Sequence, residues 1–262
     1  MRIWLTAFLA GIFLLRPAVS LAQSAEAIDA AIENGKKYLY SQLQSNGTWE
    51  TTPSSTGPEK AGDVTGSQWG GRTALATYAL LTCGEKPSDP KLKPAIEFLQ
   101  KQQQINGTYV TAIKCLVWLN LPETPEVKAA MRRDAAALRA TMKPQKQGLP
   151  VWDYGPSARS AYSLSRSQYG ALGLWAATEM NVEVPVEVWR SIERTWETAQ
   201  APDGGWRYKI PADMENDVKT NITTLSMTAS GLATMYVTQD FTRADTYSNP
   251  RGNAKSPHIE KG

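Results

Sequence analysis

The sequence predicts an all-α protein built from two layers of helices, and three observations lead to this prediction. Helix-length segments rich in charged residues alternate with segments that are almost uncharged. A short element, in which Gln is followed by Asn-Gly or Asp-Gly and then an aromatic residue, recurs along the chain. Finally, 42% of the 262 residues are hydrophobic, which is enough to form a folded core in a chain of this length.

The outer layer is predicted from segments with the periodicity of amphipathic helices. Each carries Leu, Ile, Trp or Ala on one face and Lys, Glu or Arg on the other. Pro90, Pro125 and Pro185 lie near the expected helix starts, where proline is tolerated. The expected helices span about 25–44, 89–104, 125–143 and 185–199.

The inner layer is predicted from the nearly uncharged segments between them, at about 66–83, 109–120, 164–181 and 219–238. Ser67-Gln68-Trp69-Gly70 and Ser167-Gln168-Tyr169-Gly170 lie one hundred residues apart, and each opens an apolar helix rich in small residues. Ser167 and Asn221 are the expected N-caps. A helix that is hydrophobic all round must be buried, so these helices are expected inside the outer ring.

The recurring element is expected to turn the chain from the outer layer into the inner one. Glycine after Asn or Asp accepts the left-handed backbone that ends a helix. The aromatic residue then packs over the helix end, and the Gln amide bonds carbonyl groups left free there. A structural role is therefore expected for Gln44, Gly47, Trp49, Gln104, Gly107, Tyr109, Trp152, Gln200, Gly204 and Trp206.

This pattern resembles the prenyltransferase and squalene-oxidase repeat of the α/α-toroid superfamily, which contains the terpenoid cyclases and the protein prenyltransferases. Residues 44–49, 104–109 and 200–206 are similar to the Gln-Trp motifs of squalene–hopene cyclases. Residues 151–155, followed by 167–169, resemble exported bacterial proteins of this repeat class. The resemblance covers about residues 27–240 and implies a partial α/α-toroid of four helix pairs, fewer than a closed ring of the family has.

The resemblance implies no catalytic residues. The cyclases protonate their substrate with an Asp-x-Asp-Asp cluster, and this string does not occur in the chain. The prenyltransferases bind zinc through Asp, Cys and His, whereas the single histidine, His258, lies in a polar tail where we expect it to be solvated. Zinc hydrolysis and Ser-His-Asp or Cys-His catalysis are excluded for the same reason, and no cofactor is expected.

Two acidic candidates remain. Asp153 lies between Trp152 and Tyr154 on a loop expected at the mouth of the barrel, and aromatic surroundings favour the protonated form of a carboxyl group. Asp153 is thus a candidate proton donor. Asp213, Glu215 and Asp217 alternate in a manner that suits a Ca²⁺ site, although carboxylates are also favourable beside a helix N-terminus.

Aromatic residues on the inner segments have two interpretations. They either belong to the core or line a cavity that accepts a polyisoprenoid through apolar burial and cation–π contacts. The candidates are Trp69, Trp118, Tyr169, Trp175 and Tyr236. The two cysteines, Cys83 and Cys115, are expected to be buried free thiols.

The chain ends are assigned to export and to a linker. Residues 1–22 have the pattern of a signal peptide cleaved near Ala22, with a retained membrane anchor as the alternative. Removing them takes away Arg2 and Arg16 and no acidic residue, so the net charge falls from +3 to +1. This charge excludes an electrostatic nucleic-acid binder. Residues 23–240 form the repeat domain, and residues 241–262 are expected to be a polar tail or linker.

The sequence therefore favours an exported, non-catalytic α/α-toroid repeat protein that acts as a binding or scaffold module. The expected partner is a protein or an isoprenoid or other lipid, and another chain is a candidate to complete the ring. The alternative is a terpene-cyclase-like enzyme or an isoprenoid-binding protein that uses the central cavity. In both cases no transmembrane span is expected in the mature chain.

Overall fold

The all-α class is confirmed. The computed structural model describes residues 24–51, 68–102, 107–144, 149–154, 163–209, 222–243 and 257–262. Within these residues every regular element is a helix except one two-stranded antiparallel pair. None of the helices found there is long and apolar enough to cross a membrane.

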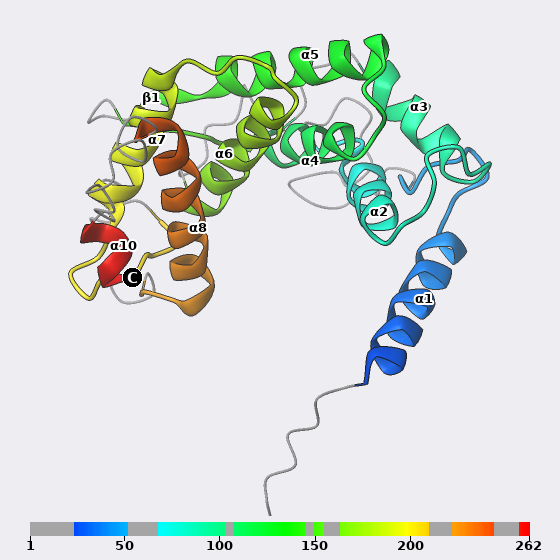
Figure 1. Ribbon diagram of the computed structural model, residues 1–262, viewed down its shortest axis with the longest axis horizontal. Coiled ribbons are helices and arrows are strands. Elements are labelled where there is room, and N and C mark those ends of the chain that lie inside the picture. Colours follow the sequence, from blue (N-terminus) through cyan, green and yellow to red (C-terminus); the bar gives the residue numbers. More distant parts are fainter. Residues whose placement is uncertain are drawn as a thin grey trace, which may run out of the picture.

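The helices follow one another along an open arc (Figure 1). Four helices form its inner side and pack each against the next: α2 (Gly71–Thr82), α4 (Thr108–Leu119), α6 (Leu164–Glu179) and α8 (Leu225–Thr242). Three helices pack against them from the convex side: α3 (Lys93–Lys101), α5 (Pro125–Thr141) and α7 (Val186–Ala199). The chain thus alternates between an outer and an inner layer.

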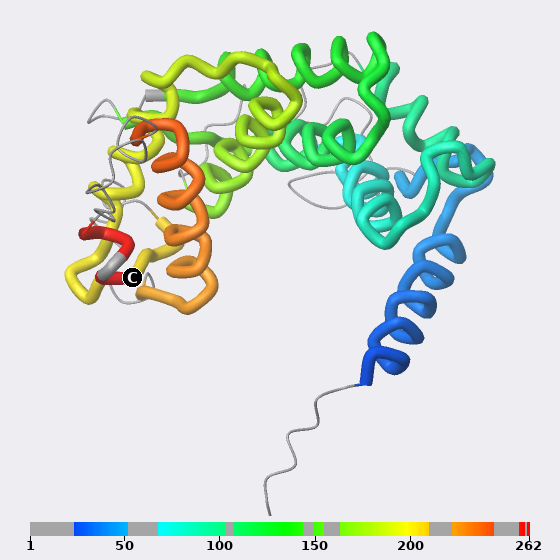
Figure 2. The backbone as a smooth tube through the Cα atoms, viewed as in Figure 1, coloured from blue at the N-terminus to red at the C-terminus, as the bar shows by residue number. Residues whose placement is uncertain are grey.

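The remaining elements lie at the ends and in one connection. Helix α1 (Ala25–Ser41) extends from one end of the arc, and the short helix α10 (Pro257–Lys261) lies beside α8 at the other end (Figure 2). Strand β1 (Lys143–Pro144) pairs antiparallel with β2 (Pro150–Val151) between α5 and α6.

The predicted boundaries are closest in the middle of the chain. Helices α4, α5, α6 and α7 agree within two residues with the segments predicted at 109–120, 125–143, 164–181 and 185–199. The last inner helix differs, because α8 begins at Leu225 rather than near 219 and extends beyond 238. Thr224 caps it, since the Thr224 hydroxyl accepts a hydrogen bond from the Met227 amide at 3.3 Å.

The predicted cap of α6 is wrong. The Ser163 hydroxyl accepts from the Arg166 amide at 3.4 Å, whereas Ser167 lies inside the helix. The other predicted cap, Asn221, lies outside the described residues. Ser163 has the extended backbone that an N-cap requires, which explains why the helix begins there.

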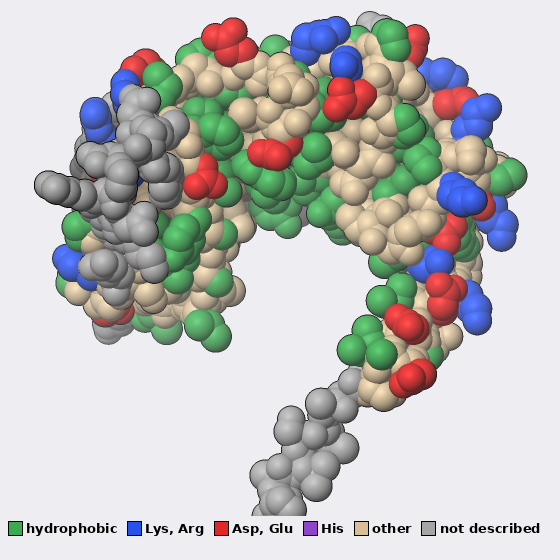
Figure 3. Space-filling view, viewed as in Figure 1, with side chains coloured by type: hydrophobic (Ala, Val, Ile, Leu, Met, Phe, Trp, Pro, Cys, Tyr) green, Lys and Arg blue, Asp and Glu red, His purple; other side chains and the backbone are tan. Residues whose placement is uncertain are grey.

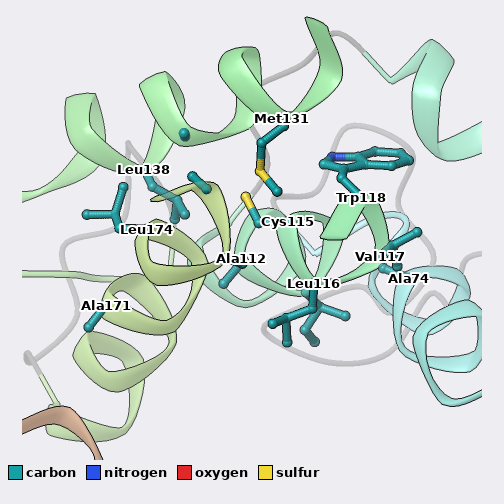
Figure 4. Packing of buried hydrophobic residues seen from close by; sticks show 14 of the residues in the cluster. Ala74, Ala112, Cys115, Leu116, Val117, Trp118, Met131, Leu138, Ala171 and Leu174 are labelled. Atoms are coloured by element: carbon teal, nitrogen blue, oxygen red, sulfur yellow. The ribbon is translucent and has the colours of Figure 1, made fainter. Parts of the chain in front are cut away.

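The core is centred on α4, which is buried at every position from Val110 to Trp118. Figure 4 shows Cys115 and Trp118 of α4 beneath Met131 and Leu138 of α5, with Leu174 of α6 alongside. The expectation of a fully buried inner helix therefore holds for α4.

That expectation fails for the inner helices at the two ends of the arc. On α2, Leu75 is 54% exposed, and on α8, Leu225 is 87% exposed and Tyr236 is 49% exposed. Among the described helices, each of these two contacts one inner neighbour, α4 for α2 and α6 for α8. A helix with apolar residues all round is therefore left uncovered where the arc stops.

The tail expected at 241–262 is partly structured. Residues 257–261 form α10, Ile259 is buried, and α10 packs on α8. The expected solvated position of His258 is also wrong. The His258 ring is half-buried, with its Nδ1 atom 2.5 Å from Oε1 of Gln200.

Candidate binding surface

Three copies of the recurring element share one geometry. One of them is a degenerate copy that ends at Trp152 and lacks Asn-Gly or Asp-Gly. We call each copy a tryptophan turn, after its residue Trp49, Trp152 or Trp206. In every copy the indole N–H donates to a carbonyl near the end of the preceding outer helix, at 2.7–2.8 Å. The backbone N–H of the same tryptophan donates to a hydroxyl in the first turns of the following inner helix, at 3.0–3.3 Å. One residue therefore connects the two layers.

Glycine is required at two places in these turns. Gly47 and Gly204 have φ angles of +76° and +90°, the left-handed conformation predicted for them. On the inner helices, an added methyl group at Gly170 or Gly231 would overlap the indole ring of Trp152 or Trp206. These contacts give the tryptophan turns a structural role between the two layers.

The glutamine of the first turn bonds a carbonyl group at a helix end, whereas the glutamine of the last turn bonds carbonyl groups within its own turn and in α10. The Gln44 amide donates to the carbonyl of Gln42, the C-cap of α1, at 2.9 Å. The Gln200 amide donates to the carbonyl of Gly204 at 2.6 Å and to that of His258 at 2.7 Å.

The second copy differs from the prediction. Gly107 is the N-cap of α4 with an extended backbone, φ −62°, and Tyr109 lies inside α4 rather than over a helix end. Gln104 lies outside the described residues. The chain enters the inner helix here directly, without the connection that separates Trp49 from α2, so the aromatic residue has no turn to close.

Asp153 is buried, 3% exposed, and not at an open mouth. Its carboxylate pairs with Nη1 of Arg166 at 3.4 Å and accepts the Tyr154 amide at 2.7 Å. The residue at the equivalent position after Trp49 is Glu50, whose carboxylate accepts the Thr73 amide at 2.9 Å. In both turns the acid anchors the start of the next inner helix, which is a structural role.

Three tyrosines gather beside this ion pair, and we call Tyr109, Tyr154 and Tyr169 the tyrosine cluster. The ring of Tyr109 meets that of Tyr169 edge-on at 4.9 Å and lies 6.1 Å from that of Tyr154. The guanidinium of Arg166 lies over the Tyr154 ring at 4.2 Å. Burial raises the pKa of the Tyr109 phenol, so this residue stays neutral well above pH 7.

The tyrosine cluster continues into an apolar stripe on α6, formed by Tyr169, Leu172 and Trp175, and we call it the concave stripe. All three side chains are half-buried. Since α4, α5 and α8 occupy the other sides of α6, the stripe lies on the concave side of the arc. Figure 3 shows hydrophobic side chains gathered along this inner edge.

The remaining predicted wall residues do not join the stripe. Trp118 is fully buried between α4 and α5, where its indole N–H donates to Asp134 at 2.8 Å, so it belongs to the core. Trp69 meets Phe98 edge-on at 6.4 Å near α3. Tyr236 is exposed on α8, at the end of the arc.

A buried ion pair between α4 and α5 was not predicted from the sequence. Lys114 of α4 and Asp134 of α5 are 1% and 3% exposed, with Nζ 3.3 Å from the carboxylate. Burial lowers the pKa of Lys114, and the facing carboxylate opposes this shift. A signal was present, because Lys114 is the only charged residue between Thr108 and Leu119.

The other candidates give no site among the described residues. Asp213, Glu215 and Asp217 lie outside them, and within them no three His, Cys, Asp or Glu side chains are grouped to hold a metal ion. Both cysteines are free, but Cys83 is exposed rather than buried. Burial raises the pKa of the Cys115 thiol well above its ordinary value, which keeps it unreactive.

Searches against protein-family models, curated proteins and solved structures found no match for this chain.

Glu85 holds the end of α1 to the arc. Its carboxylate pairs with Lys36 at 2.7 Å and accepts the Tyr40 hydroxyl at 2.9 Å. These contacts, that of Lys36 first, lower the pKa of Glu85, so their stabilising effect is present above about pH 4.5 and is lost as the pH falls through the lowered value.

We therefore expect Glu85→Gln to speed hydrogen exchange of the α1 amides several-fold at neutral pH, after correction for intrinsic rates. The same change is expected in the unmodified chain on acidification. Glu33→Gln is the control, since Glu33 contacts the same lysine from an exposed position on α1 itself. Equal effects of the two variants would contradict an anchoring role for Glu85.

Proposed function

We propose that this protein is a non-catalytic binding module of the α/α-toroid class, an open arc of helix pairs that holds an apolar ligand on its concave side. The observation that carries this proposal is the concave stripe beside the tyrosine cluster, since it presents half-exposed aromatic and aliphatic side chains. The acidic candidate next to it, Asp153, is engaged by Arg166.

The residue chemistry supports an isoprenoid or another lipid chain as the ligand. Tyr169, Leu172 and Trp175 offer apolar surface, and the tyrosine cluster adds ring faces and hydroxyl groups at one end. A long hydrocarbon gains free energy mainly from removing its surface from water, which such a stripe provides. A polar headgroup would lie at the tyrosine end.

The test is binding of farnesol and a longer polyprenol to the full chain, purified as its host processes it. We expect a rise in melting temperature and a retained isoprenoid in the mass spectrum after incubation with lipid extract. Trp175→Gln should weaken binding about tenfold or more, as expected when one large apolar contact is lost. Tyr38→Ser, on exposed α1, is the matched control and should bind normally.

A chain that carries no lipid and shows no thermal shift with either isoprenoid would overturn the lipid proposal. Equal isoprenoid affinities of Trp175→Gln and the unmodified chain would show that the ligand does not bind at the concave stripe.

The alternative is catalysis with Asp153 as the proton donor, and the same binding samples distinguish it from the non-catalytic proposal. Asp153→Asn removes the charge that pairs with Arg166 and should cost about 1.5–3 kcal/mol of folding stability. It should leave isoprenoid affinity unchanged. Turnover of a polyprene that disappears in this variant, while the variant remains folded, would overturn the non-catalytic proposal.

We also propose that the protein is exported. The support is the sequence pattern of residues 1–22, in which Arg2 precedes an apolar run that ends in the small-residue cleavage pattern near Ala22.

A further inference from the structure

Helix α1 is exposed at every residue from Ala25 to Gly35. None of its residues is buried, although it carries the apolar stripe of an amphipathic helix, with Ile28 at 48% and Ile32 at 40% exposed. Only its C-terminal end is attached to the arc, through Tyr40, Lys36 and the carbonyl of Leu39. An isolated helix of this length is marginally stable in water, so the apolar stripe calls for a partner.

The stripe of α1 continues onto α2 in a groove of about 300 Å³. Leu39, Trp49 and, on α2, Leu75 and Ala79 line it, together with the exposed Arg72. We call the apolar surface of α1 together with this groove the leading face.

The opposite end of the arc exposes a second apolar surface. On α8 the positions Leu225, Ala229, Ala233 and Tyr236 are all exposed and lie on one face at helical spacing. Asp240, one turn beyond Tyr236, is the only charged residue of this 18-residue helix. We call this surface the trailing face. A solvent-facing helix surface without charges is unusual for a monomer.

The helix contacts along the arc indicate which kind of helix would cover each face. The outer helix α5 contacts both of the inner helices that flank it in the chain, α4 and α6, while α3 packs on α2 and α7 packs on α8. Among the described helices, α1 is followed by the inner helix α2 and has no second inner helix beside it, whereas α8 contacts α6, α7 and the short α10 but no further helix pair. A helix of the α8 type would therefore fit beside α1, and a pair of the α1–α2 type would fit beyond α8.

We propose that copies of this chain associate head to tail, with the leading face of one copy packed on the trailing face of the next. In this contact α1 and α2 take the place of the next helix pair beyond α8. Leu75 lies over the small residues Ala229 and Ala233, and Tyr236 enters the groove.

Small residues allow this approach within the chain already, because Gly173 of α6 packs on Ala112 of α4 so closely that an added methyl group would lie 2.9 Å from the Ala112 Cα. Exposed Arg72 beside the leading face complements exposed Asp240, which lies one turn beyond the trailing face, and this favours the head-to-tail orientation over a symmetric contact.

A second copy is the occupant that fits both surfaces together. The two faces are different, so their pairing is heterologous and generates a closed ring or an open chain of copies. This inference depends on the open arc in the proposed function, but not on the ligand.

The test measures association by sedimentation velocity and native mass spectrometry over a wide range of concentrations. The unmodified chain should self-associate. Leu75→Glu, on the leading face, and Tyr236→Glu, on the trailing face, should each weaken association about tenfold or more, because each buries a charge without a partner. Both side chains are about half-exposed, so both variants should fold.

Mixing the two variants gives the decisive result. Leu75→Glu keeps an intact trailing face and Tyr236→Glu an intact leading face, so the mixture should form a one-to-one complex that grows no further. Ile32→Glu should replace Leu75→Glu with the same outcome. Val186→Glu, an exposed apolar position on the outer layer, is the matched control and should associate like the unmodified chain.

A monomeric unmodified chain, or association that both single variants retain, would overturn the inference. So would a mixture that forms no complex, because a symmetric contact or a different partner predicts that result. Isoprenoid binding by a monomeric chain would overturn this inference alone and leave the proposed function in place.

Discussion

Asp134→Ala is expected to lower the free energy of unfolding by about 3–5 kcal/mol, the cost of removing one partner from a buried ion pair. The substitution leaves the ammonium of Lys114 buried without its facing carboxylate. It also removes the acceptor for the Trp118 indole and for Arg133, whose guanidinium nitrogen lies 3.0 Å from the carboxylate. Urea unfolding followed by circular dichroism measures the change.

The matched experiment replaces both charges. Lys114→Met combined with Asp134→Leu fills the same space with apolar atoms and should recover most of the lost stability, since buried ion pairs often contribute little beyond a well-packed apolar pair. Glu97→Ala, which removes an exposed acid on α3, is the control and should cost less than about 1 kcal/mol. A cost as small for Asp134→Ala would contradict the buried position of the pair.

Trp152→Ala is expected to destabilise the protein by a similar amount, about 3–5 kcal/mol, the range for removing a fully buried aromatic side chain. The indole is 0% exposed, packs against Gly170 and donates to the Leu138 carbonyl at 2.8 Å. Its loss leaves a cavity at the junction of the outer and inner layers. Trp175→Ala, at a half-buried position, should cost less in the same urea titration.

The glycine facing the ring gives an independent test. Gly170→Ala should destabilise on its own, because the added methyl group overlaps the indole of Trp152. Combining it with Trp152→Leu, which is smaller, should cost less than the sum of the two single changes. Additive effects would show that the two residues do not pack together.

The middle of the fold was predictable because local signals and burial agree there. The charged and uncharged segments that became α4 to α7 have clear periodicity, and the tryptophan turns carry glycines that a left-handed backbone requires. The prediction for the second copy was wrong. Asn106-Gly107-Thr108-Tyr109 matches the sequence of the other turns, but it lies directly before α4, where Gly107 is the N-cap. Sequence similarity does not report the length of the connection that follows.

The concave stripe and the buried ion pair could not be predicted in full, because they depend on contacts between separate helices. Tyr169 and Trp175 were candidates from the sequence, but the contact of Tyr169 with Tyr109 depends on how α6 packs against α4. Asp134 lies on the apolar face of α5, one turn from Met131 and Leu138, and that placement is readable from the sequence. Its pairing with Lys114 is not, because the two residues meet through the packing of separate helices.

The buried pair of Lys114 and Asp134 also restricts how this protein can evolve. Each charge makes the loss of the other harmful, so a lineage that replaces one residue passes through a destabilised intermediate before the second replacement restores the core. The two positions should therefore vary together among descendants of this chain: a lysine at position 114 should be accompanied by an acid at position 134, and an apolar residue at one by an apolar residue at the other.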